Sequence, residues 1–185
     1  MLETITPEAI ARAQTGDPAV IGDIYDYYRL GVYRYLYYRV GDPQTAEDLT
    51  SEVFLRMIRS LNGYHPQNVA FDAWLFQIAR NLSIDHYRKS GSREHLSLEE
   101  DMIADHTDDP DRNLENNLTS DVLLKALAKL SETQRDVIVL RFVNGLPIAQ
   151  VAQTLHKSEN AIKAMQRRSL AKLRATLIEW EVTYA

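Results

Sequence analysis

The sequence predicts an all-α protein made of two small helical domains that a flexible acidic linker joins. Apolar residues recur at spacings of three and four almost throughout, which is the period of an amphipathic helix. No sustained alternating run bounded by turn residues calls for a β-strand. Capping residues stand directly before proline at Thr6-Pro7 and at Asp42-Pro43, and this order marks two helix starts in the first half.

Charge divides the chain into three parts. Residues 1–90 carry 9 basic and 11 acidic side chains (net −2), residues 91–121 carry 2 and 10 (net −8), and residues 122–185 carry 10 and 5 (net +5). The middle part is poor in large apolar residues and cannot bury enough surface to fold alone, so it is the predicted linker. We therefore expect domains at 1–90 and 122–185, tethered but not rigidly packed together. The overall charge of −5 does not exclude nucleic-acid binding, because local charge attracts phosphate.

Composition excludes several classes of protein. The chain has no cysteine, so a disulfide framework and a thiolate metal site are both excluded. The histidines have no second ligand at a convincing spacing, and we expect neither a metal nor another cofactor. No window approaches the apolar length of a membrane span, and the acidic first residues do not resemble a secretion signal. We therefore expect a cytoplasmic protein without membrane insertion.

The C-terminal part has the spacing of a helix-turn-helix. A short helix is predicted over residues 148–155 and, after a three-residue turn, a longer helix from Ser158. Ser158 can cap this second helix, whose N-terminal N–H groups then face a phosphate. The candidate DNA contacts are Ser158, Asn160, Lys163, Arg167 and Arg168. The predicted packing face holds Ile162, Met165, Leu170, Leu173 and Leu177. An ordinary amphipathic helix with solvated basic side chains is the alternative.

The sequence LSETQRDVIVLRFVNGLPIAQVAQTLHKSENAIKAMQRRSLAKLR, residues 130–174, resembles region 4 of the extracytoplasmic-function sigma factors of bacterial RNA polymerase. The resemblance implies a helix-turn-helix that reads the minus-thirty-five element of a promoter. Two residues depart from the family pattern. His156 stands where the turn usually has glycine, and Pro147 stands where Ser or Thr usually begins the short helix. Histidine is among the residues enriched at positive φ, and proline suits a first helical position.

A second resemblance lies in the first half. The stretch DPQTAEDLTSEVFLRMIRSL resembles sigma region 2.2, an acidic-faced helix that docks on a coiled coil of the polymerase β′ subunit. It implies Glu47, Asp48 and Glu52 as the polymerase contacts, although the family usually has glutamine where this chain has Ser51. Apolar residues of the same helix, Ile58 among them, can turn toward the core. A solvated acidic face is the alternative.

A third resemblance follows directly. FDAWLFQIARNLSIDHYRK resembles the joined sigma regions 2.3 and 2.4, which engage the minus-ten element as it opens, and in the family the preceding loop, here LNGYHPQNVA, holds one flipped base. The candidate minus-ten contacts are Asn62, Tyr64, Asn68, Arg80, Asn81, Arg88 and Lys89. Which loop residue lines the base pocket stays open. Trp74 lies on the apolar stripe and is predicted to pack. The tyrosine-dense run at residues 24–40 is predicted to be helical core with amphipathic rims.

The order of these resemblances indicates an extracytoplasmic-function sigma factor, which lends promoter recognition to RNA polymerase. The implied partners are core RNA polymerase, chiefly its β′ coiled coil, promoter DNA and an anti-sigma factor. A helix-turn-helix activator of the response-regulator type is the alternative, but its receiver half would alternate strands and helices. A helical adaptor is a further alternative. A helical enzyme would need a nucleophile with a paired base, which we do not find, so we predict no enzymatic activity.

Overall fold

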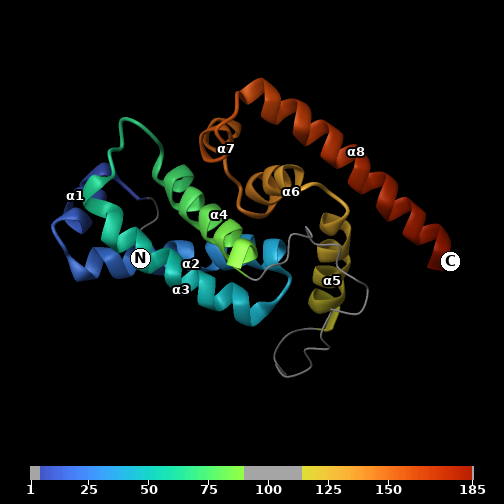
Figure 1. Cartoon of the computed structure of the whole chain (residues 1–185), viewed down its shortest axis with the longest axis horizontal. Helices are drawn as coiled ribbons and strands as arrows, with labels where there is room; N and C mark the ends of the chain where they lie inside the picture. Colours follow the sequence, from blue (N-terminus) through green and yellow to red (C-terminus); the bar gives the residue numbers. More distant parts are fainter. Residues whose placement is uncertain (1–4, 90–113, 185) are drawn as a thin grey trace.

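The computed structural model describes the backbone of residues 5–89 and 114–184 and the side chains of 5–89 and 121–180, and every regular element in these ranges is helical (Figure 1). This confirms the predicted all-α fold. The elements of the first half are α1 (Pro7–Gln14), α2 (Pro18–Val40), α3 (Pro43–Ser60), the 3-10 turn η1 (Leu61–Gly63) and α4 (Phe71–Lys89). Those of the second half are α5 (Leu114–Ala128), α6 (Glu132–Ile138), the π-helical turn η2 (Val139–Val143), α7 (Ile148–Leu155) and α8 (Glu159–Tyr184).

Side-chain caps set the starts of the first helices. The Thr6 hydroxyl accepts a hydrogen bond from the N–H of Ala9 at 3.2 Å, and the Asp42 carboxylate accepts one from the N–H of Thr45 at 2.7 Å. In both helices proline fills the next position, where its missing N–H costs nothing. The two predicted helix starts are confirmed.

Helices α2, α3 and α4 pack against one another to form the N-terminal bundle, and α1 covers its end at α2 and η1 (Figure 1). Tyr28 and Tyr35 of α2 are buried, whereas Tyr25 and Tyr27 are exposed, as expected for a core helix with amphipathic rims. Ile58 of α3 differs from the expectation, because its side chain is 46% exposed. Ile58 lies about 100° around the helix from the buried Met57, at the edge of the apolar face and outside the arc that packs into the bundle.

The second half begins earlier than its charge pattern indicates. Helix α5 starts at Leu114, so residues 114–121, which the sequence analysis assigned to the linker, are helical. The buried side chains Leu124, Ala126 and Leu127 anchor α5, and a helix that is already formed gains one hydrogen bond for each residue added at its end. Residues 91–113 of the predicted linker lie outside the described residues.

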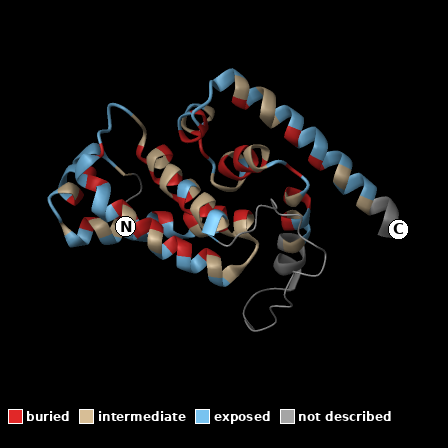
Figure 2. Ribbon diagram, viewed as in Figure 1, coloured by how far each residue is buried: buried red, intermediate tan, exposed pale blue. Residues whose placement is uncertain are grey.

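The two halves are packed together, which corrects the expectation that they are only tethered. Helix α4 packs along α7, and α2 packs against α6 and η2. The buried apolar side chains of both halves form one continuous cluster, and Figure 2 shows buried residues on the facing sides of these helices. Charge repulsion within the linker does not oppose this packing, because the contacts are made by residues that lie elsewhere in the chain.

Candidate nucleic-acid and polymerase interfaces

The turn between α7 and α8 has the geometry of a helix-turn-helix. His156 ends α7 in the left-handed region, with φ 51°, so histidine takes the conformation that glycine usually supplies. The hydroxyl of Ser158 accepts a hydrogen bond from the N–H of Ala161 at 3.2 Å, which confirms its predicted cap. Pro147 lies one residue before the first helical position and makes no side-chain cap. The turn and both helix limits therefore follow the predicted spacing.

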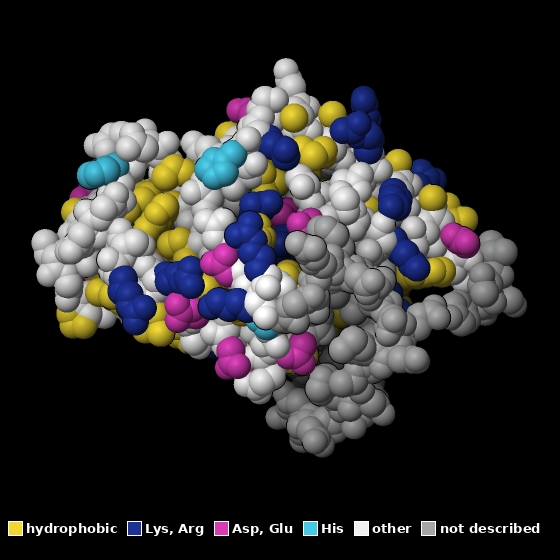
Figure 3. Space-filling view, viewed as in Figure 1, with side chains coloured by type: hydrophobic (Ala, Val, Ile, Leu, Met, Phe, Trp, Pro, Cys, Tyr) yellow, Lys and Arg dark blue, Asp and Glu magenta, His cyan; other side chains and the backbone are white. Residues whose placement is uncertain are grey.

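One face of α8 packs and another is open to solvent. Ile162 and Leu173 are buried against the body of the second half. Four candidate DNA contacts, the side chains of Asn160, Lys163, Arg167 and Arg168, are exposed. Lys163 approaches Glu159 at 3.8 Å, a pair that is exposed on both sides. Lys and Arg side chains follow α8 across the right-hand part of the face in Figure 3. This strip has the charge and the accessibility that a phosphate backbone needs.

The predicted packing stripe of α8 is covered only in part. Leu170 and Leu177 are 41% and 40% exposed, although the sequence analysis placed both on the packing face. The buried side chains Ile162, Ser169 and Leu173 lie within about 20° of one direction around α8. Leu170 and Leu177 lie about 60–80° from that direction, at the edge of the apolar face. The periodicity predicts which face is apolar, and the position of a side chain within that face decides how far α5, α6 and α7 bury it.

The acidic candidates lie along α3. Glu47 and Asp48 are exposed, and Glu52 is half-buried. The Glu52 carboxylate accepts a hydrogen bond from Nε of Arg56 at 3.0 Å. Arg56 also approaches Asp85 of α4 at 3.8 Å, an ion pair that links α3 to α4. Two of the three predicted polymerase contacts are thus open acidic side chains, and the third shares its charge with an arginine.

The loop between α3 and α4 presents two of its three candidates. Asn62 and Asn68 are exposed. Tyr64 is buried instead: its hydroxyl donates to the carbonyl of Val69 at 2.9 Å, and its ring lies edge-on to Phe71 at 5.4 Å between centroids. The side chain of Tyr64 therefore shapes the loop from inside and is not offered to a base in this conformation. A tyrosine in a polar loop carries no sequence signal that distinguishes these two positions.

Of the candidate DNA contacts on α4, three face solvent and one faces the second half. Asn81, Arg88 and Lys89 are exposed. Trp74 packs against Tyr64 at 4.7 Å between ring centroids and lies against the core, as predicted. Arg80 faces the second half, where its Nε donates to Oδ2 of Asp136 at 3.1 Å. Its guanidinium is therefore already paired within the chain.

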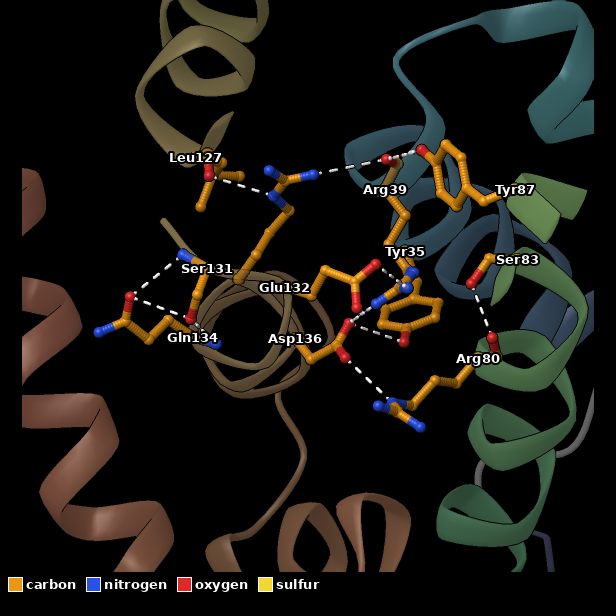
Figure 4. A network of polar contacts seen from close by, with 11 residues as sticks. Tyr35, Arg39, Arg80, Ser83, Tyr87, Leu127, Ser131, Glu132, Gln134 and Asp136 are labelled. Atoms are coloured by element: carbon orange, nitrogen blue, oxygen red, sulfur yellow. Dashed lines mark hydrogen bonds and ion pairs between the residues drawn. The ribbon is translucent and has the colours of Figure 1, made fainter. Parts of the chain in front are cut away.

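Asp136 stands at the centre of a buried polar cluster that joins the halves (Figure 4). Its carboxylate has no solvent exposure and accepts hydrogen bonds from the Tyr35 hydroxyl at 3.0 Å, from Nη1 of Arg39 and from Arg80. Glu132, one helical turn before it, approaches Nη2 of Arg39 at 3.7 Å. Three donors from α2 and α4 thus meet one acceptor from α6.

The chemistry of this cluster follows from its burial. Burial raises the pKa of Tyr35 above its ordinary value, and the negative charge of Asp136 raises it further, so Tyr35 remains a hydrogen-bond donor. Burial alone would lower the pKa of Arg39, but the pKa lies above its ordinary value because Tyr35 and Asp136 favour the charged guanidinium. The cluster is therefore a cation–anion contact that solvent does not weaken.

Sequence reasoning did not single out Arg39 or Asp136. A signal exists for each, because Arg39 lies at a core spacing near the end of the tyrosine-dense run and Asp136 precedes the apolar residues 137–140. Charged residues are almost never fully buried unless they are paired. A single sequence does not show that these two residues, 97 positions apart, are partners.

The described part of the chain holds neither a cluster of metal ligands nor a helix that could span a membrane. Within residues 5–89 and 114–184, no group of three His, Asp or Glu side chains is arranged to hold a metal ion. No helix in the same ranges is long and apolar enough to cross a membrane.

Comparison with known families assigns both halves. Residues 24–93 match the family sigma-70 region 2, and residues 126–175 match sigma-70 region 4. The chain is 41% identical over 167 residues to the ECF RNA polymerase sigma factor BldN of Streptomyces coelicolor, covering 90% of this chain and 63% of BldN. It is 31% identical over 156 residues to the ECF RNA polymerase sigma factor SigX of Bacillus subtilis, covering 82% of this chain and 80% of SigX.

Solved structures show the same fold. CnrH, determined in complex with the cytosolic domain of CnrY, aligns with a TM-score of 0.72 at 22% identity, over 92% of this chain and 96% of that one. The sigma factor RpoE of Bartonella quintana, determined with the anti-sigma factor NepR, aligns with a TM-score of 0.63 at 23% identity, over 84% and 96%.

Proposed function

Because the chain belongs to the extracytoplasmic-function sigma factors of RNA polymerase, we propose that it directs core polymerase to specific promoters and helps to open their DNA. The observation that carries this proposal is the helix-turn-helix with its basic strip exposed on α8, placed after a helical bundle that has its own acidic and basic surfaces. We divide the work between residues 1–90 and 122–185, with α5 extending the second part to Leu114.

The second half reads the minus-thirty-five element in this proposal. Helix α8 enters the major groove at its N-terminus, where Ser158 and the free N–H groups meet a phosphate. Asn160 and Lys163 lie within the first turns of α8, and Arg167 and Arg168 lie about one turn further along. The exposed positions of these side chains support the assignment, because each can reach DNA without leaving the packed core.

The first half engages the minus-ten element. Asn62 and Asn68 offer amide donors and acceptors from the loop, while Asn81, Arg88 and Lys89 offer amide and cationic contacts along α4. Tyr64 stabilises the shape of the loop from its buried side, since its hydroxyl donates to the carbonyl of Val69. Arg80 joins this surface only when it leaves Asp136.

Polymerase docking falls to α3. Glu47 and Asp48 project into solvent, and Glu52 lies one turn beyond Asp48 on the same side of the helix. Buried side chains such as Val53 and Met57 hold the opposite face of α3 in the bundle. An acidic face on a rigid helix suits a basic surface on the β′ coiled coil, through charge complementarity that speeds association and selects the partner.

The other partners and the location follow from the family. We propose that an anti-sigma factor binds this chain, as NepR binds the sigma factor RpoE of Bartonella quintana. We propose further that the protein acts in the cytoplasm, where promoter DNA lies, and that it catalyses no reaction of its own.

Run-off transcription with purified core polymerase tests the proposal. A template whose upstream and minus-ten elements match the preferred promoter should give a transcript only when this protein is added. A template with both elements scrambled is the control. Equal transcription from the two templates, or none from either over a library of promoter sequences, would contradict promoter recognition.

A further inference from the structure

The donors around Asp136 belong to the first half, and the acceptor belongs to the second. Tyr35 and Arg39 lie one turn apart on α2, and Arg80 lies on α4. All three direct a hydroxyl or guanidinium hydrogen at the same carboxylate, as Figure 4 shows. Arg39 is 2% exposed, and its Nε has no hydrogen-bond partner among the described residues. The Asp136 carboxylate therefore leaves one N–H of this guanidinium unused.

The other contacts between the halves hold α7 against α4 and the second half against α2. The Gln77 amide donates to the carbonyl of Gln153 at 2.9 Å, and the Gln153 side chain accepts from the N–H of Ala70 at 3.2 Å. On α2, the Asn144 amide donates to the carbonyl of Gly31 at 2.8 Å. A Cβ at Gly31 would lie only 3.1 Å from that amide nitrogen, so glycine permits this close approach.

Separating the halves leaves two guanidinium groups and a hydroxyl on the first half with no counter-charge. Asp136 is then exposed on α6 and hydrated, at little cost. The donors instead face the solvent as a compact cationic site on the same bundle that carries Asn81, Arg88 and Lys89. A guanidinium fork and a hydroxyl are donors that suit phosphate oxygens as well as they suit a carboxylate.

We propose that Tyr35, Arg39 and Arg80 form a phosphate-binding site for promoter DNA, which the carboxylate of Asp136 fills while the halves are packed together. The inference rests on the proposed function, because it extends the minus-ten surface. The second half thereby competes with DNA for the first half. A phosphodiester of the opened strand takes the place of the carboxylate when α6 and α7 move away, and Gln77 and Arg80 become accessible in the same step.

The test measures opening and DNA binding separately in the full chain. The chain has no native cysteine, so Ala11→Cys and Ala175→Cys, at exposed sites on α1 and α8, take a donor and an acceptor dye for energy transfer. Asp136→Asn removes the internal anion at nearly constant volume. Asn144→Ala breaks the contact to Gly31 and leaves all three donors in place. Binding is measured with fluorescent single-stranded oligothymidylate, and thermal melting confirms that each variant is folded.

Both variants should lower energy transfer and tighten oligothymidylate binding by roughly 5- to 150-fold, the usual range of coupling between two sites. Adding Arg80→Ala to either variant should remove most of that gain while energy transfer stays low. The matched control Arg59→Ala, an exposed arginine on α3, should change neither measurement.

Three results would overturn the proposal. Unchanged energy transfer in both folded variants would show that the cluster does not hold the halves together. A gain in oligothymidylate affinity that survives Arg80→Ala would place the DNA elsewhere. A gain in affinity for core polymerase without a gain for oligothymidylate would show that the site binds a protein. Full competition by inorganic phosphate, at an equal concentration of phosphate groups, would show that it binds a small anion. Run-off transcription is independent of these readouts, so a failure of promoter recognition is distinguished from a failure of this site.

Discussion

The side-chain amide of Gln14 donates to the carbonyl of Tyr64 at 2.8 Å, and so ties helix α1 to the loop that precedes α4. The same nitrogen donates to the carbonyl of Leu61 at 2.9 Å. One amide group thereby satisfies two carbonyls on the turn that presents Asn62 to solvent. The N-terminal helix thus has a direct part in shaping the loop that is proposed to hold a promoter base.

Replacing Gln14 should loosen that loop. Gln14→Ala leaves two carbonyls without this donor, and each unsatisfied buried group costs about 1–3 kcal/mol, so we expect the free energy of unfolding to fall by about 1–3 kcal/mol in total because the site is only partly buried. Amide hydrogen exchange should quicken over residues 61–70. Gln44→Ala on the exposed face of α3 is the control. Unchanged exchange in the loop would show that other contacts fix its shape.

Reversing the charge on α3 should weaken binding to core polymerase. Asp48→Arg with Glu52→Arg replaces two acidic groups of the proposed docking face by basic ones. The fold should persist, since Asp48 is exposed and the Glu52–Arg56 pair contributes only about 0.3–0.5 kcal/mol. Competition for core polymerase against the wild-type chain measures the effect, with Asp26→Arg on α2 as the control. A helical double variant that competes as well as the wild type would contradict the docking assignment.

The basic strip of α8 should distinguish promoters. Lys163→Ala and Arg167→Ala should each cost about 1–3 kcal/mol on a matched upstream element if the contact is to a base. A contact to phosphate would weaken all promoters alike and reduce the salt dependence by about one unit. Lys172 is exposed and lies nine residues from Lys163, on the opposite side of the helix, so Lys172→Ala is the control. Equal losses in all three variants would rule out a specific recognition strip.

The local signals in this sequence were strong enough to predict the elements. The short helix at 148–155, the serine cap at Ser158 and the left-handed position at His156 all depend on a few neighbouring residues, and the structure confirms them. Burial was less predictable, because it depends on how the neighbouring helices pack across an apolar face. Ile58 and Leu170 have apolar spacing but remain exposed, while Tyr64 is buried within a polar loop. These outcomes depend on tertiary contacts rather than on local pattern.

The contact between the halves was the least accessible to sequence reasoning. The charge of the linker suggested independent domains, yet Arg39 and Asp136 meet across 97 positions. Each is a charged residue beside an apolar run, and one sequence gives no means of pairing them. The consequence for the site is direct, since Arg80 looked like a free DNA contact and is held within the chain.

Tyr28 makes a buried contact whose effect on stability depends on pH. Its hydroxyl donates to Oδ1 of Asp72 at 2.8 Å. Burial, and secondarily the charge of Asp72, raise the pKa of Tyr28 above its ordinary value near 10, and burial raises the pKa of Tyr35 in the same direction. In the unfolded chain these tyrosines lose their protons as the pH passes about 10, whereas in the folded chain they keep them. Ionisation therefore stabilises only the unfolded state in this range.

The free energy of unfolding should be insensitive to these tyrosines below pH about 10 and should fall above it, by up to about 1.4 kcal/mol per pH unit for each. Tyr28→Phe has no proton to lose, so its decline should be shallower by up to that amount, after an initial loss of about 1 kcal/mol for the hydrogen bond. Urea unfolding at a series of pH values from neutral to alkaline measures both effects. Tyr27→Phe, at an exposed neighbouring position, should follow the wild-type curve. If Tyr28→Phe also follows the wild-type slope, the Tyr28 hydroxyl ionises alike in the folded and unfolded chains, and its contact with Asp72 does not protect the proton.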